Sequence, residues 1–382
     1  MHSHPLLWAS YTQSFLTQRF DAVLHKKTLG SVYYAVLGTL TSARAGVAHI
    51  GRGLAEARGL SPKHAIKQVD RLFSNELLSV EDLAPYWLEF VAGSRTDLVV
   101  ALDWTEFAKS DHSTLVLSVI AHDKRATPVL WKTVQRSGIQ RIAVEDELLE
   151  RLRAALPPPI RITLLADRGF ASRAMYLFLR ALQIDFVIRF KSSLLIGSSD
   201  GEMQPAAQHI PKHGRTYSIT SARITSERAE VPRIVLKHAK GMKESWCLAS
   251  SRADLKPSEV VNLYGRRFTI EERFRDIKDL RFGMGVSAVQ MESDQRRDRL
   301  LLIIVLAQTL LHILGAAGEA LGMSRLLKAN TVKSRVHSLY RQGQTYLQLL
   351  PTMPEIQSEK LLRRFLELLL QHAKTSKLLA LL

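Results

Sequence analysis

The sequence predicts an α/β protein, in which a mixed-sheet core is interrupted by a β-rich insertion and flanked by helical N-terminal and C-terminal regions. Strand-like apolar runs alternate with helical patterns in the first part of the core, and period-2 alternation dominates the insertion. A helix-start signal marks the N-terminal flanking region. With 382 residues the chain has room for several structural units, which we expect at 1–95, 96–190, 191–252, 253–325 and 326–382.

The N-terminal region contains a strong helix start at Ser61-Pro62, because serine caps helices and proline suits the first helical position. The helix that follows, Pro62 to Phe73, has an apolar stripe and a basic stripe, the latter made of Lys63, Lys67 and Arg71. A shorter helix around residues 47–57 precedes it. This pair suits either a DNA-binding helix-turn-helix or a helical bundle with solvated lysines, and the sequence leaves both open.

The core begins with three strand-like segments that suggest an antiparallel meander. A helix, a strand, a second helix and a fifth strand follow. Three strands, helix, strand, helix, strand is the element order of an RNase-H-like core. In sequence order the segments are Leu98–Asp103, Ser113–Ala121, Thr127–Val134, Val144–Leu156, Arg161–Asp167, Arg173–Gln183 and Asp185–Phe190.

The insertion and the C-terminal half follow. Alternating or apolar segments at 217–225, 233–237 and 246–250 predict a β subdomain inserted into the core. Ser258 is positioned to cap a helix that runs to about Leu280, and residues 295–382 have mostly helical patterns. The uncharged segment Leu300–Gly318 is at the lower edge of the length of a membrane-spanning helix, and we favour a buried core helix over a membrane segment.

Composition bears on partners and compartment. The chain has 53 Lys and Arg against 36 Asp and Glu, a formal charge of +17, which favours a polyanionic partner such as nucleic acid. Cys247 is the only cysteine, so no internal disulfide can form, and a reducing compartment fits. We find no signal-peptide pattern at the N-terminus and expect a cytoplasmic protein associated with the bacterial nucleoid.

The most informative segment surrounds Glu271. On a continuous helix, at about 100° per residue, Tyr264, Arg267, Glu271, Arg275 and Lys278 would fall within roughly 80° of one another. One acid would then lie among cations and a tyrosine, a pattern suited to a divalent metal with phosphates beside it. The neighbouring Glu272 would lie roughly 100° away from Glu271.

Two aspartates complete a candidate metal site. Asp103 and Asp167 each end an apolar, strand-like run, which places them at the rim of a sheet. An aspartate there is often only a turn or cap residue, so neither predicts a site alone. Together with Glu271 they could hold two Mg²⁺ ions, which orient the nucleophile and stabilise charge in phosphodiester cleavage and strand transfer.

The motif and its context resemble the DDE transposases of bacterial insertion sequences, specifically the IS-four family. That family's signature is Tyr, two residues, Arg, three residues, Glu, six residues, Lys, and it is met by Tyr264, Arg267, Glu271 and Lys278. Further segments resemble the group of the transposon-ten transposase, in the same order along the chain: Lys63–Asn75, Val100–Trp104, Leu165–Phe170, Trp246–Ala249 and Ala329–Val332.

The resemblance implies roles for single residues. Asp103, Asp167 and Glu271 would be the catalytic triad that binds Mg²⁺, with Mn²⁺ able to substitute. Tyr264, Arg267, Arg275 and Lys278 would grip phosphates near the cleaved end. Trp246 would receive a flipped base and stabilise a DNA hairpin, although a core tryptophan fits this position too.

The expected function is cut-and-paste transposition. The protein would bind terminal inverted repeats of double-stranded DNA, excise the element through a probable hairpin, and join its ends to target DNA. The resemblance also implies a homodimer in the DNA complex and no membrane partner. A non-catalytic DNA-binding protein derived from a transposase and a structure-specific nuclease are the alternatives.

Overall fold

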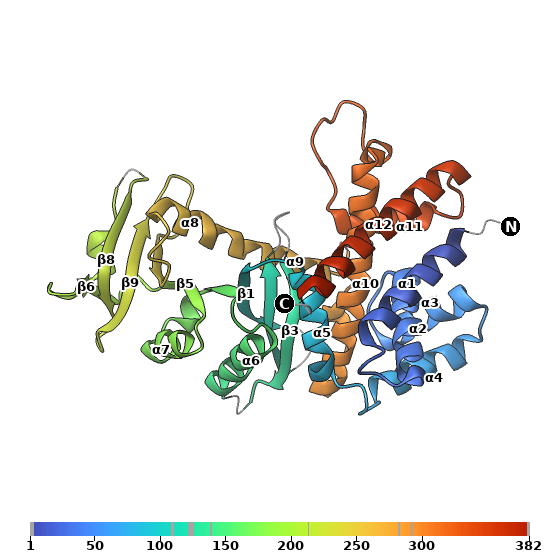
Figure 1. Ribbon diagram of the computed structural model, residues 1–382, viewed down its shortest axis with the longest axis horizontal. Helices are drawn as coiled ribbons and strands as arrows, with labels where there is room; N and C mark the ends of the chain where they lie inside the picture. Colours follow the sequence, from blue (N-terminus) through green and yellow to red (C-terminus); the bar gives the residue numbers. More distant parts are fainter. Residues whose placement is uncertain are drawn as a thin grey trace.

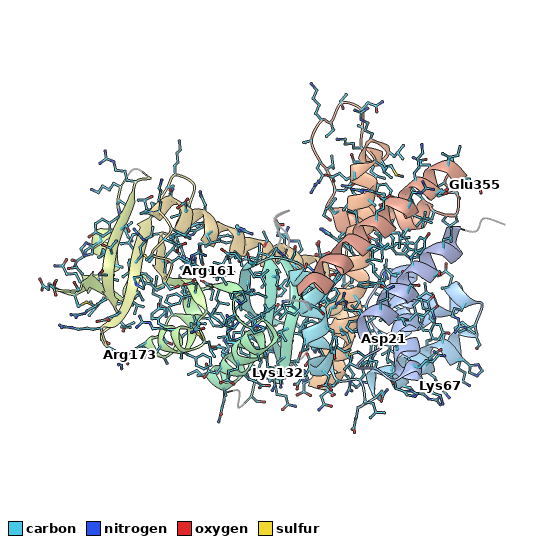
Figure 2. The ribbon with its side chains drawn as sticks, viewed as in Figure 1. Asp21, Lys67, Lys132, Arg161, Arg173 and Glu355 are labelled. Atoms are coloured by element: carbon cyan, nitrogen blue, oxygen red, sulfur yellow. The ribbon has the colours of Figure 1, made fainter. Side chains whose placement is uncertain are left out.

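The computed structural model describes residues 4–107, 111–120, 126–137, 140–212, 214–281, 283–291 and 293–379. The molecule is elongated, with β8 and β9 at one end of the long axis and α1 to α4 at the other (Figure 1). Between these ends lie the core strands and the long helix α10, Asp294–Ala320. Lys67 and Arg173 lie toward opposite ends (Figure 2).

The ten strands among the described residues belong to one mixed sheet in the order β3-β2-β1-β4-β5-β10-β9-β8-β6-β7. The pairs β1–β4 and β4–β5 are parallel, and the other neighbours are antiparallel. The strands are β1 Asp97–Glu106, β2 His112–Ile120, β3 Ala126–Gln135, β4 Arg161–Ala166, β5 Asp185–Phe190, β6 Leu195–Ser198, β7 Gln204–Pro205, β8 Thr216–Ile224, β9 Ala229–Lys237 and β10 Trp246–Ser250.

The first five strands confirm the predicted element order, and the sheet fits an RNase-H-like core. Helices α6, Arg141–Ala155, and α7, Arg173–Ala181, follow β3 and β4 as expected. The final residue of the predicted second strand, Ala121, lies outside the described residues. The first strand is longer than predicted, so Asp103 lies three residues before its end instead of terminating it.

The insertion does not fold as a sheet of its own. Strand β10 pairs antiparallel with β5, and Cys247 lies opposite Phe190, so β6 to β10 extend the core sheet. In Figure 1 these strands continue the sheet away from the helical regions. The pairing joins segments about sixty residues apart, which local sequence patterns do not reveal. Two short 3₁₀ turns lie between strands of this sheet: η1 Arg168–Phe170 follows β4, and η2 Ala206–His209 follows β7.

The two faces of the core sheet bury alternate residues, because successive side chains of a strand point to opposite faces. On one face, Val100 and Leu102 belong to the hydrophobic cluster that includes residues of α6 and α7. On the other face, Ala101 and Leu165 pack in a second cluster with Tyr264 and Ile270. The segment from 257 to 278 therefore covers one face of the sheet.

The N-terminal region is helical, as predicted. The helix Pro62–Phe73 has the predicted bounds, and the preceding helix ends at Arg58. Gly51 lets the two approach closely, since a Cβ there would lie 2.5 Å from the Cα of Ile66. The helices are α1 His4–Phe20, α2 Lys26–Ser42, α3 Val47–Arg58, α4 Pro62–Phe73 and α5 Val80–Ala92.

Helix α10 forms the centre of the helical half. By length and composition it could cross a membrane, but 83% of its most apolar window is buried inside the protein. It packs against α2, β3, α11 and α12, which agrees with the predicted core helix. The remaining C-terminal elements are the 3₁₀ turn η5 Met323–Leu327, α11 Leu339–Leu349 and α12 Glu355–Leu379.

Candidate active site

Sheet register brings the two predicted aspartates together. Leu102 of β1 lies opposite Ala166 of β4 in a parallel pair, so the next residues, Asp103 and Asp167, are neighbours at the same edge. Adjacent strands lie roughly 5 Å apart. Asp167 also caps η1, because its Oδ1 accepts a hydrogen bond of 2.7 Å from the backbone N–H of Arg168. Asp167 therefore does have the cap role that is common for an aspartate after a strand. It also lies beside Asp103.

Glu271 comes from a helical segment that is less regular than predicted. The prediction of one continuous α-helix from Ser258 to about Leu280 is wrong. The chain instead forms α8 Pro257–Gly265, the 3₁₀ turn η3 Arg266–Phe268 and α9 Thr269–Lys278. Lys256, not Ser258, is the N-cap of α8, with Pro257 at the first helical position. The tighter 3₁₀ turn, with about 3.0 residues per turn, changes the angular relation between Tyr264 and Glu271.

Arg267 lies between the three acids. Its Nη1 is 3.4 Å from Asp103 Oδ2 and 3.4 Å from Glu271 Oε1, and its Nη2 is 3.5 Å from Asp167 Oδ2. The Arg267 side chain is only 5% exposed, whereas that of Glu271 is 51% exposed. The carboxylates of two strands and one helix thus converge on a single guanidinium.

The electrostatics reflect this concentration of acids. Burial raises the pKa of Asp103 to about 6, and the neighbouring Asp167 and Glu271 add to the increase, while Arg267 opposes it. Burial alone would lower the pKa of Arg267, but Tyr264, Asp103 and Asp167 raise it overall. Burial is thus the main cause of the raised pKa of Asp103, and Arg267 opposes the increase more strongly than either neighbouring acid adds to it.

Two further predicted cations lie on α9. Lys278 is half-buried, and its Nζ lies 5.3 Å from the ring centroid of Phe107 and 5.7 Å from that of Phe274. Burial lowers the pKa of Lys278, against the effect of Asp103 and Glu106. Arg275 is exposed to solvent. Lys278 therefore lies near Asp103, whereas Arg275 faces solvent on the same helix.

An aromatic cluster surrounds the predicted base-binding position. Trp246 is partly buried, and its ring stacks on Phe268 with centroids 5.7 Å apart and an interplanar angle of 21°. Tyr264 meets the Trp246 ring edge-on at 5.1 Å and is only 1% exposed. Phe268 is 40% exposed and was missed from sequence, because a single aromatic within a charged segment gives no periodic signal.

The basic stripe of α4 is open to solvent. Lys63, Lys67 and Arg71 are all exposed, and Lys67 and Arg71 line a groove of about 870 Å³ between α4 and the start of α2. Polar side chains complete its lining, including His64, Gln68 and Asn75. The stripe does not contribute to the carboxylate cluster. It forms a separate basic surface in the N-terminal region.

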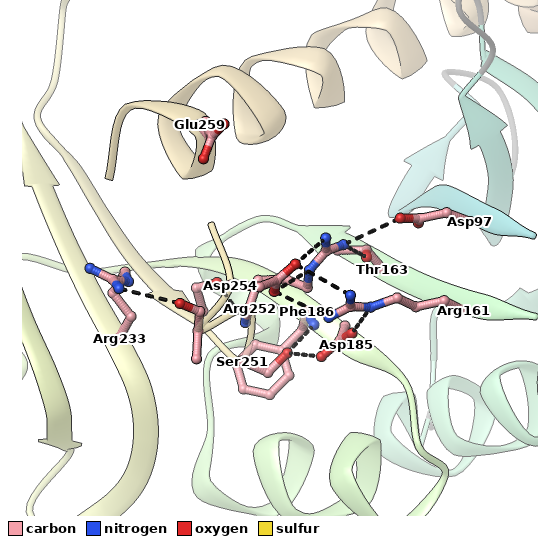
Figure 3. A network of polar contacts seen from close by, with 12 residues as sticks. Asp97, Arg161, Thr163, Asp185, Phe186, Arg233, Ser251, Arg252, Asp254 and Glu259 are labelled. Carbon is pink, nitrogen blue, oxygen red and sulfur yellow. Dashed lines mark hydrogen bonds and ion pairs between the residues drawn. The ribbon is translucent and has the colours of Figure 1, made fainter. Parts of the chain in front are cut away.

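The opposite edge of the parallel strands holds an unrelated polar network (Figure 3). There Arg252 donates to Asp254 at 2.9 and 2.8 Å and to Thr163 Oγ1 at 2.8 Å. Asp97, at the start of β1, also faces Arg252, at 3.8 Å. A cavity of about 620 Å³ adjoins this edge, and none of the three site acids lines it. Asp97 therefore lies at the end of β1 away from the carboxylate cluster.

The comparison with known families decides the identity. A family model described as the transposase DDE domain matches residues 94–310, more than half of the chain. The chain belongs to the DDE transposase family. A search of curated proteins found no match.

The family match establishes the kind of chemistry. A DDE transposase is an enzyme of the polynucleotidyl transferase type that acts in transposition, with DNA as its substrate. DDE transposases generally use divalent metal ions. The matched region of this transposase runs from just before β1 into α10 and contains Asp103, Asp167 and Glu271.

The three carboxylates are suitable ligands for such an ion, although their side chains are not arranged around one in this structure. Three carboxylates, the oxygen ligands that Mg²⁺ prefers, already face a shared cation. Among the described residues, no group of three His, Cys, Asp or Glu has a geometry that could hold a metal as it stands.

Proposed function

We propose that this enzyme is the transposase of an insertion sequence of the IS-four family, related to the transposon-ten group. It would bind terminal inverted repeats, excise the element by cut-and-paste cleavage through a hairpin intermediate, and join the ends to target DNA. The observation that carries the proposal is the convergence of Asp103, Asp167 and Glu271 on Arg267 at one edge of the sheet.

Asp103, Asp167 and Glu271 would hold the divalent metal, Mg²⁺ with Mn²⁺ as a substitute. When bound, the metal supplies charge stabilisation for the attacking and leaving oxygens of the phosphodiester. The protein's part is positioning. Strands β1 and β4 fix the two aspartates side by side, and α9 brings Glu271 over them.

The cations and aromatic residues around the acids would bind the DNA end. Lys278 and the exposed Arg275 are placed to contact phosphates beside the cleaved bond. Trp246, with Phe268 stacked on it, offers an aromatic surface for a flipped base. Tyr264 and Arg267 are buried in the free protein, so we propose that they first organise the site and meet DNA only after it rearranges.

Helix α4 would recognise the terminal repeat. Its open face carries Lys63, Lys67 and Arg71 for phosphates, and His64 and Gln68 can form hydrogen bonds to base edges. The enzyme would act as a homodimer on paired ends. It would work in the bacterial cytoplasm at the nucleoid, where its DNA substrate is located.

The test is a cleavage and joining assay with DNA that carries the inverted repeats flanking the gene, with and without Mg²⁺. Asp103→Asn, Asp167→Asn and Glu271→Gln should each lower cleavage at least about a hundred-fold, while repeat binding stays within a few-fold of wild type. Glu272→Gln, one residue further along the same helix, is the matched control. Full cleavage by any triad variant would refute the assignment, and cleavage without joining would indicate a nuclease.

A further inference from the structure

Two buried arginines occupy opposite edges of the same sheet, and their surroundings differ. Arg252, 7% exposed, is held by short hydrogen bonds of 2.8 to 2.9 Å to Asp254 and Thr163, as Figure 3 shows. Such distances are typical of charge-assisted hydrogen bonds. Arg252 therefore has the contacts of a structural ion pair.

Arg267 is equally buried, at 5% exposure, but it is held more loosely. Each of its three carboxylate contacts is 3.4 or 3.5 Å long, outside the usual range of about 2.7–2.9 Å. Its Nε has no hydrogen-bond partner among the described residues. Tyr264 also hydrogen-bonds the guanidinium, and two of the carboxylate contacts are long hydrogen bonds of 3.4 Å, so Arg267 has no short carboxylate pair like that of Arg252 with Asp254.

Three carboxylates that share one guanidinium differ from the bidentate pairing of Arg252 with a single carboxylate, that of Asp254. Three carboxylates from β1, the β4 end and α9 face one positive charge, which leaves the cluster with excess negative charge. A divalent cation would neutralise these acids better than a single guanidinium does. Two cations cannot share the same centre without strong repulsion.

We propose that Arg267 is a placeholder cation, which holds Asp103, Asp167 and Glu271 together in the metal-free enzyme and is displaced when the divalent metal binds. The inference rests on the proposed function, in that these acids are taken as the metal ligands. Arg267 would be a positioning residue that competes with the metal. Because competition is reciprocal, a stronger hold by the guanidinium means a weaker apparent affinity for metal.

Displacement would also free the guanidinium to contact a DNA phosphate. Arg267 is not accessible to DNA while it lies between the acids. Once released, it remains at the edge of the site, one helical turn from Glu271, where a DNA phosphate beside the metal is the nearest new anion. Metal binding and DNA gripping would then be coupled through one side chain, and the metal would bind most readily when DNA is present.

The test measures Mn²⁺ binding to the DNA-free, full-length protein by electron paramagnetic resonance. Arg267→Gln removes the charge and keeps a polar side chain, whereas Arg267→Lys keeps the charge. Arg275→Gln, which removes an exposed charge from the adjoining helix α9, controls for long-range electrostatics. Arg252→Gln controls for the loss of a buried arginine.

The placeholder role predicts that Arg267→Gln binds Mn²⁺ at least about five-fold more tightly than wild type. Arg267→Lys and both control variants should stay within about two-fold of wild type. A purely structural Arg267 would instead leave the acids disordered when it is replaced, and Mn²⁺ affinity would fall. An unchanged or weaker affinity of Arg267→Gln overturns the inference.

Thermal unfolding supplies a second readout. Without metal, Arg267→Gln should melt at a lower temperature than wild type, and saturating Mn²⁺ should raise its melting temperature by more than it raises that of wild type. Arg252→Gln should also melt lower, with the wild-type response to Mn²⁺. If Arg267→Gln folds only when Mn²⁺ is added, the inference is supported, and if it stays unfolded with Mn²⁺, the inference is refuted.

The same Mn²⁺ measurement distinguishes an error in the proposed metal ligands from an error in the placeholder role. If Asp103→Asn binds Mn²⁺ as tightly as wild type does, the acids are not the metal ligands and the underlying assignment falls. If Asp103→Asn loses Mn²⁺ while Arg267→Gln behaves like wild type, only the placeholder role is wrong.

Discussion

Asp103 and Arg267 face each other at one edge of the sheet, with Asp103 Oδ2 3.4 Å from Arg267 Nη1. The pair connects β1 to η3, between the helices α8 and α9, so it fixes how the Glu271 segment sits over the strands. Both side chains are largely buried, and removal of Arg267 would leave three carboxylates without their shared cation. The same contact therefore supports the fold and occupies the position where chemistry is proposed.

Lys278 gives a prediction about the salt dependence of DNA binding. If its ammonium group contacts one phosphate, Lys278→Gln should weaken binding and reduce the slope of log affinity against log salt by about 0.9. Lys132→Gln on β3 is the control, since Lys132 pairs with Glu147 at 2.5 Å, away from the site acids. Fluorescence anisotropy over a range of salt concentrations measures both slopes, and an unchanged slope for Lys278→Gln would exclude the contact.

Trp246 gives a prediction about the hairpin. Stacking of a base on an aromatic ring is worth about 1–3 kcal/mol, so Trp246→Ala should nick the end normally but form about ten-fold less hairpin. Trp246→Phe preserves a ring next to Phe268 and should retain most of the product. Denaturing gels of end-labelled DNA separate the nick from the hairpin. Equal hairpin yields from Trp246→Ala and wild type would show that the ring is only a packing element.

Much of the fold could be predicted from local patterns. The helix Pro62–Phe73 and the strand Asp185–Phe190 have the expected bounds, because capping residues and apolar runs mark their ends. The shared edge of Asp103 and Asp167 also follows from two apolar runs that form neighbouring parallel strands. The pairing of β10 with β5 could not be predicted, because register between distant segments is set by tertiary packing.

The position of Arg267 could not be predicted either. Its place among the acids depends on the 3₁₀ turn Arg266–Phe268 and on the packing of Tyr264 against Trp246, neither of which periodicity reveals. The helical geometry assumed from the sequence placed Arg267 beside Glu271 on one strip of the helix. In the structure Arg267 is turned inward, so its proximity to Glu271 was foreseen but its burial was not.

The attachment of α4 to the core gives a stability prediction. Arg299, 7% exposed, donates at 2.9 Å to the carbonyl of Phe73 at the end of α4 and at 2.9 Å to the carbonyl of Leu78. Arg299→Met leaves these buried acceptors without a donor, which should cost about 1–3 kcal/mol of unfolding free energy. Urea denaturation measures the loss.

Arg296 is the matched comparison for Arg299. Its Nη2 lies 2.6 Å from Asp70 Oδ1, but both side chains are substantially exposed. Solvent screens such a pair, so Arg296→Ala should cost less than about 1 kcal/mol. If the Arg296 variant were the less stable of the two, the exposed ion pair, and not the buried carbonyl contacts, would be what holds α4 to α10.

Asp298 on α10 gives a prediction about pH. Thr133 of β3 donates to both carboxylate oxygens, from its hydroxyl at 2.5 Å and from its backbone N–H at 3.2 Å. Burial of the carboxyl group nevertheless raises the pKa of Asp298 to about 7, and Asp294 and Glu81 add to the increase. The folded state therefore binds a proton that the unfolded state releases at about pH 4.

The sign of the effect follows from that difference. The stability contributed by protonated Asp298 is complete below about pH 4 and is lost as pH rises toward 7, with a total of about 1–4 kcal/mol. Asp298→Asn cannot titrate, and its amide can donate to the Thr133 hydroxyl. Relative to this variant, wild type should gain unfolding free energy between pH 8 and pH 5, as measured by urea denaturation at both values. Parallel changes in the two proteins would mean that the carboxyl at the α10–β3 contact stays ionised throughout this range.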